Sequence, residues 1–130
     1  MILDRLSEAL SGRADLRLAI LYGSAAKGAL RADSDIDLTV ALEKPMTPAD
    51  LMAIMETVTA ACGRPADVAD LRTAGGLFLH QILSKGTLFV NRDPALYHDL
   101  AARSLEFIED IQPIVQAERL KRIRSFANGR

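Results

Sequence analysis

Two aspartates one residue apart, Asp35 and Asp37, stand at the start of an apolar run and are the side chains best suited to chemistry. In a β-strand, residues i and i+2 point to the same face, so we expect the two carboxylates to project together. Two negative charges on one face repel each other unless a cation lies between them. Magnesium suits this position, because it prefers oxygen ligands and one ion or a pair of ions relieves the repulsion.

A turn of small residues precedes the aspartates. The stretch YGSAAKG, residues 22–28, directly follows an apolar run. Glycine lets the backbone approach a ligand closely, and the amides at a helix N-terminus favour an anion. Gly23 and Ser24 are therefore predicted to bind the phosphates of a nucleotide, and Lys27 adds a positive charge nearby. The turn and the aspartates complement each other, since magnesium commonly binds a polyphosphate.

The same residues do not fit two other common ligand-binding loops, the EF-hand loop and the P-loop. In an EF-hand loop, Leu38 would replace the invariant glycine and Lys44 the bidentate glutamate, so that type fails. A P-loop also fails, because its lysine and hydroxyl residue do not follow the second glycine. The remaining alternative is that the glycines only form turns. Against it, a strand interior disfavours the Asp37 side chain unless that side chain has a function.

Regular elements must hold these motifs in position. The apolar pattern predicts a short helix from Ser24 and a break or kink at Pro113 in a helical segment of about 94–127. Strands that alternate with helices predict an α/β or α+β fold, with a small mixed sheet flanked by helices. The other predicted helices cover residues 2–11, 48–62 and 75–84, and the predicted strands cover 16–22, 36–42, 67–71 and 87–91.

Composition narrows the class of protein. The 130 residues fit one domain, 1–130, with 49% hydrophobic residues, 25% charged residues and a net charge of −1. We therefore expect a globular protein without a membrane span, a signal peptide or direct nucleic-acid binding. Cys62 is the single cysteine, so no internal disulfide is possible, and a cytoplasmic location is expected. The basic segment 119–130 reads as a solvated helix face or as a contact with an acidic partner or RNA.

The two motifs together resemble a known signature. Gly23-Ser24, ten residues and then Asp35-x-Asp37 is similar to the GS-x10-DxD pattern of the nucleotidyltransferase superfold, which is like the palm of polymerase β. The resemblance implies that the Gly-Ser turn holds the β- and γ-phosphates of a nucleotide. It also implies that the two aspartates bind magnesium, with two ions expected, and that a third acid on a neighbouring strand completes the site.

Asp67, in the segment DVADL, is the position that matches this third acid. The resemblance then makes Asp35, Asp37 and Asp67 both the catalytic residues and the magnesium ligands. Asp70 is the alternative third acid. Three residues along a strand place it on the opposite face from Asp67, which favours Asp67.

The whole chain resembles one subfamily, the MntA-type antitoxins of HEPN/MNT toxin–antitoxin pairs. The features that carry this resemblance are DVADL, the helical segment GLFLHQILSKG, the strand TLFVN, Arg92-Asp93 and the long helix from Pro94. The resemblance implies transfer of AMP from ATP to a tyrosine hydroxyl of a HEPN ribonuclease toxin encoded next to it. That transfer blocks the toxin, and assembly with the toxin or as a homodimer is expected.

Two alternatives stay open at this point. One is transfer of a nucleotide to a small hydroxylated molecule such as an aminoglycoside. The other is an antitoxin that neutralises its partner by binding alone. Intact Gly23, Ser24, Asp35 and Asp37 count against binding alone, because a binding protein has no need for two like charges on one face.

Overall fold

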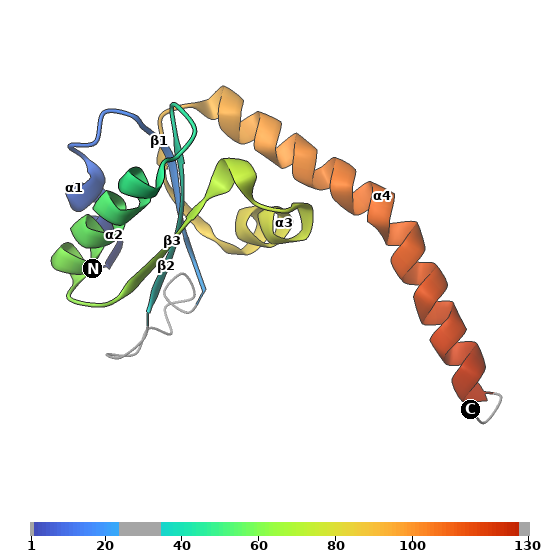
Figure 1. Cartoon of the computed structure of the whole chain (residues 1–130). Helices are drawn as coiled ribbons and strands as arrows, with labels where there is room; N and C mark the ends of the chain where they lie inside the picture. The colour runs from blue at the N-terminus through green and yellow to red at the C-terminus, as the bar shows by residue number, and fades with distance from the viewer. Residues whose placement is uncertain (1, 24–34, 128–130) are drawn as a thin grey trace.

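The computed structural model describes residues 2–23 and 35–127 of the chain (Figure 1). Ser24, Lys27 and the short helix predicted from Ser24 lie outside these residues. Within the described parts, no helix combines the length with the apolar character that a bilayer crossing requires. The elements in chain order are α1 (Ile2–Leu10), β1 (Leu16–Tyr22), β2 (Ile36–Leu42), α2 (Pro48–Cys62), β3 (Ala66–Asp70), the 3₁₀ helix η1 (Leu71–Thr73), α3 (Gly76–Lys85), β4 (Thr87–Asn91) and α4 (Pro94–Ala127).

The strands form one small mixed sheet, as the sequence predicted, and their order in it is β3-β2-β1-β4. β1 pairs antiparallel with both β2 and β4, whereas β2 and β3 are parallel. Parallel neighbours require a crossover connection, and α2 supplies it between β2 and β3. This crossover places the end of β2 that carries Asp37 beside the start of β3.

Helices cover both faces of the sheet (Figure 1). The first face packs on α1 and α2, in a core that includes Leu6, Leu38 and Ile54. The second face packs on α3 and the beginning of α4, in a core that includes Ile20 and Leu79. Alternate residues of each strand enter the two cores, which explains the almost continuous apolar runs in β1 and β2.

The start of α2 is fixed by a capping box. The Thr47 hydroxyl accepts a hydrogen bond from the Asp50 amide at 3.1 Å, and the Asp50 carboxylate accepts one from the Thr47 amide at 3.0 Å. Pro48 occupies the first helical turn, where its missing N–H is not needed. Arg13 binds the same carboxylate at 2.7 Å, which ties the beginning of α2 to the connection before β1.

Thr47→Ala is expected to lower the free energy of unfolding by about 1 kcal/mol, because the Asp50 amide loses its acceptor. Chemical denaturation of the two proteins measures the difference. Thr57→Ala is the matched control, since the Thr57 hydroxyl donates to the Ala53 carbonyl within the same helix and caps nothing. Equal stability losses in the two variants would contradict a specific role for the cap.

Of the predicted break or kink at Pro113, the break is wrong, because α4 is a single helix of 34 residues with Pro113 inside it. Pro113 cannot donate to the carbonyl of Glu109, but both residues are exposed, so water can satisfy that carbonyl. The helix axis bends near the middle in Figure 1, as a proline inside a helix predicts. Residues 112–127 are all exposed, and this half of α4 extends away from the body (Figure 1).

Candidate active site

Gly23 forms the turn that ends β1. Its φ is +81°, in the left-handed region where glycine is favoured. A Cβ at this position would lie 2.6 Å from Oδ2 of Asp37, closer than a Cβ comes to an oxygen atom in real proteins. The absence of a side chain at Gly23 therefore lets the backbone turn pack directly against a carboxylate.

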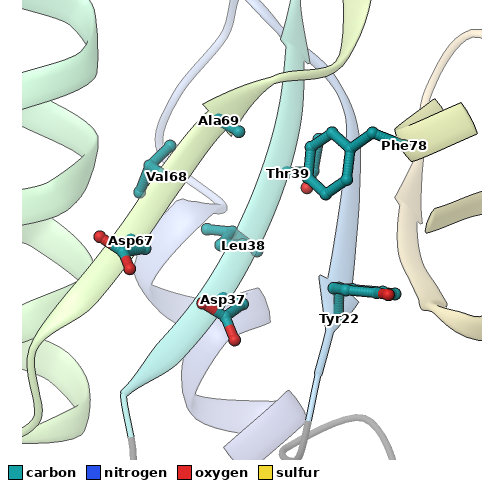
Figure 2. A pocket seen from close by; sticks show the side chains of 8 residues that line it. All are labelled: Tyr22, Asp37, Leu38, Thr39, Asp67, Val68, Ala69 and Phe78. Carbon is teal, nitrogen blue, oxygen red and sulfur yellow. The ribbon is translucent and has the colours of Figure 1, made fainter. Parts of the chain in front are cut away.

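Three strands bring their side chains into one row beside this turn. Tyr22 on β1 pairs with Asp37 on β2, and Asp37 pairs with Asp67 on β3. Neighbouring strands lie about 4.8 Å apart, and paired residues point to the same face. Figure 2 shows the two carboxylates on adjacent strands, with the Tyr22 ring on the other side of Asp37.

The row accumulates negative charge. Partial burial raises the pKa of Asp37, and the charges of Asp67 and then Asp35 raise it further. Asp35 precedes β2, which begins at Ile36 as predicted, so the strand pairing does not decide whether its side chain shares a face with Asp37, and that expectation stays a prediction. It lies exposed just before the strand, and it still acts on Asp37 through its charge.

Asp70, the alternative third acid, lies elsewhere. Its side chain accepts a hydrogen bond from the Arg72 amide at 3.0 Å and caps η1. It borders a separate hollow next to α2, together with Val68 and Thr73. The predicted difference in face between Asp67 and Asp70 is therefore present, and Asp67 is the acid that lies beside Asp37.

The row opens into a cavity of about 430 Å³ on the face of the sheet that α3 partly covers. This volume lies in the usual range for small-molecule sites. Besides the two carboxylates, the cavity is bordered by aromatic and small side chains, among them Tyr22, Phe78 and Ala69. The aromatic side chains suit a flat ring, and the two carboxylates suit a cation.

Comparison with protein families supplies the decisive observation, since residues 4–95 match the model of the polymerase beta nucleotidyltransferase family. The chain belongs to this family. The match includes β1, the Gly23 turn, β2, β3 and α3, so the row of Tyr22, Asp37 and Asp67 lies within the nucleotidyltransferase region.

Solved structures of similar fold extend the likeness over the whole chain. A toxin–antitoxin structure with AMP-PNP contains a chain that is 22% identical, with 98% of this nucleotidyltransferase and 99% of that chain covered at a TM-score of 0.69. A chain of an MntA–HepT toxin–antitoxin structure is 18% identical over 94% and 97% of the two chains, with a TM-score of 0.68. A chain in the complex of a tri-AMPylated Shewanella oneidensis HEPN toxin with an MNT antitoxin is 17% identical over 95% of this nucleotidyltransferase and 99% of that chain, with a TM-score of 0.69. At these identities the likeness establishes the nucleotidyltransferase fold.

The carboxylates of this nucleotidyltransferase have the donor chemistry for magnesium. Among the residues that the structure describes, no three acidic, histidine or cysteine side chains gather into a ready-made metal site. Magnesium does not require one, because it commonly takes one or two protein carboxylates and completes its shell with water and phosphate oxygens. Asp37 and Asp67 fit that pattern, and the charge repulsion at Asp37 favours a cation there.

Sequence reasoning missed the aromatic part of the site. Tyr22 directly precedes the glycine turn, and the pairing of β1 with β2 would have placed it beside Asp37. Phe78 gave no local signal, because only the packing of α3 on the sheet brings it to the cavity. The roles of Ser24 and Lys27 in binding phosphate stay predictions, since both residues lie outside the described parts of the chain.

Proposed function

We propose that this nucleotidyltransferase is an antitoxin that transfers AMP from ATP to a tyrosine hydroxyl of a HEPN ribonuclease toxin encoded beside it. The observation that carries the proposal is the pairing of Asp37 with Asp67 next to the Gly23 turn. The protein partner is supported by the whole-length likeness to chains of toxin–antitoxin structures, one of which holds a tri-AMPylated HEPN toxin. ATP as the substrate and a ribonuclease as the target agree with a cytoplasmic reaction.

The reaction is the attack of the tyrosine oxygen on the α-phosphorus of ATP. A new O–P bond forms, the bond to the β-phosphate oxygen breaks, and pyrophosphate leaves with that electron pair. Asp67 accepts the proton of the hydroxyl, because it borders the cavity on the side away from the phosphate turn. The backbone at Gly23 approaches the β- and γ-phosphates, together with Ser24 and Lys27.

Asp37, Asp67 and Asp35 are the residues that would hold magnesium. When bound, the ion neutralises charge on the triphosphate and lowers the pKa of a coordinated hydroxyl. Asp37 lies between the turn and Asp67 in the row, so a cation held there would be placed to bind the α-phosphate. Asp35, which is exposed just before β2, would be the third carboxylate ligand.

One labelling experiment tests the proposal. The full chain is incubated with magnesium, the product of the adjacent gene and ATP labelled in the α-phosphate, and the proteins are separated. Label on a tyrosine of the neighbour is expected, while ATP labelled in the γ-phosphate leaves no label. Label from the γ-phosphate would indicate a kinase instead.

Two further outcomes would overturn the proposal. Label on an added aminoglycoside, with none on the protein, would identify a small-molecule nucleotidyltransferase. A stable complex that inhibits the ribonuclease without any label would identify an antitoxin that acts by binding. Mapping the label by mass spectrometry also counts the AMP groups that each toxin chain receives.

A further inference from the structure

The cavity has two parts of different chemistry. Asp37 and Asp67 border one end, where the strands begin on this face (Figure 2). Two residues further along the same strands, Thr39 and Ala69 border the other end, and Phe78 reaches it from α3 (Figure 2). No charged side chain belongs to this second part among the lining residues that the structure describes. The second part therefore suits an uncharged, flat group.

The geometry of the proposed reaction decides which part of the nucleotide lies there. In an in-line displacement, the attacking hydroxyl and the leaving pyrophosphate lie on opposite sides of the α-phosphorus. Asp67 on β3 marks the side of the hydroxyl, and Gly23 at the end of β1 marks the side of the pyrophosphate. The nucleoside then leaves the α-phosphate roughly perpendicular to this axis, and the cavity continues in one such direction, along the strands toward Thr39 and Phe78.

Two aromatic rings border the path of the nucleoside. The rings of Tyr22 and Phe78 meet edge to face, with centroids 6.2 Å apart and an interplanar angle of 87°. This is a favourable arrangement for an aromatic pair, and it holds the Phe78 ring from one side. Phe78 is nevertheless 41% exposed, so a large part of its ring surface is available to a ligand.

We propose that the Phe78 ring, held in place by Tyr22, stacks on the nucleobase of the bound nucleotide. This inference rests on the proposed nucleotidyl transfer, because the direction of the nucleoside follows from that reaction. Stacking on an aromatic ring accepts any base but is stronger for the larger purine rings. Purine nucleotides are therefore expected to bind better than pyrimidine nucleotides. Because Thr39 and Ala69 are the other neighbours of the base, the site distinguishes adenine from guanine only weakly.

Binding of a nucleotide that cannot react tests the proposal directly. Calorimetry measures the affinity of the full chain, with magnesium, for α,β-methylene-ATP and for α,β-methylene-CTP. Phe78→Leu keeps an apolar side chain of similar volume but removes the ring. It is expected to bind the ATP analogue roughly 5- to 150-fold more weakly and to lose most of the preference over the CTP analogue.

Two controls separate base stacking from general damage. Leu77 precedes Phe78 in α3, is 54% exposed and does not line the cavity, so Leu77→Ala is expected to leave both affinities unchanged. Inorganic tripolyphosphate has no base, and its affinity is expected to be the same for Phe78→Leu and the wild type. An unchanged affinity of Phe78→Leu for the ATP analogue would overturn the proposal, and so would an equal loss for tripolyphosphate.

The outcomes also distinguish this inference from the proposed function. If the wild type binds the ATP analogue through Phe78 but never labels a partner, the transfer to a toxin fails and the base site stands. If the wild type labels the toxin and Phe78→Leu binds like the wild type, only the base site fails. A wild-type chain that binds no nucleotide at all contradicts both.

Discussion

Asp37→Asn is expected to lower AMP transfer about 1,000-fold or more while the protein becomes more resistant to heat. Asparagine has nearly the same size, so the row on the sheet keeps its shape. Loss of the charge removes several kcal/mol of stabilisation of the reacting phosphate, and each 1.36 kcal/mol corresponds to tenfold in rate. Loss of the charge also ends the repulsion that Asp67 and Asp35 exert on this half-buried position. Single-turnover transfer assays and thermal unfolding without magnesium measure the two effects.

Asp70→Asn is the matched control for this prediction. It makes the same chemical change three residues beyond Asp67, on the other face of β3, where the side chain caps η1. Asparagine can also accept the hydrogen bond of such a cap, so both transfer and stability should stay close to the wild type. Normal transfer by Asp37→Asn, or equal losses in the two variants, would refute the assignment of the carboxylates.

Gly23→Ala is expected to reduce transfer about 100-fold and to destabilise the fold by about 1–2 kcal/mol. The stability loss arises because an L-residue at φ +81° is strained. The activity loss arises because the new Cβ would meet Oδ2 of Asp37 at 2.6 Å and push the carboxylate away. A displacement of about 1 Å in an active site can cost about 100-fold in rate. Transfer kinetics and chemical denaturation measure the two losses separately.

Gly63→Ala separates strain from displacement. Gly63 has a similar φ of +67° at the end of α2, but a Cβ there would meet nothing within 4 Å. This variant should lose a similar amount of stability and keep its transfer rate. If both glycine variants transfer AMP at the wild-type rate, Gly23 is only a turn residue and the proposed approach of its backbone to the phosphates is wrong.

Local signals in the sequence predicted most of the fold. β1 and β2 have the predicted bounds, because each is an apolar run with a glycine or an acid at its boundary. α2 has the predicted start, because Thr47, Pro48 and Asp50 act through hydrogen bonds within a few residues. The opposite faces of Asp67 and Asp70 were predictable for a similar reason, since side chains alternate between the two faces of a strand whatever the strand packs against.

The features that the sequence did not predict depend on what surrounds a residue in the folded protein. The sequence could not show that Pro113 lies where water surrounds the helix, and that environment lets α4 continue. Phe78 was missed because its position depends on how α3 packs on the sheet, and no local pattern encodes that.

The projecting half of α4 also affects the way the free chain moves in solution. At 1.5 Å per residue, the 34 residues of this helix extend for about 51 Å. A compact chain of 130 residues has a radius of gyration of about 14 Å. A lone molecule is therefore elongated, with a larger radius of gyration and more hydrodynamic drag than a sphere of equal mass.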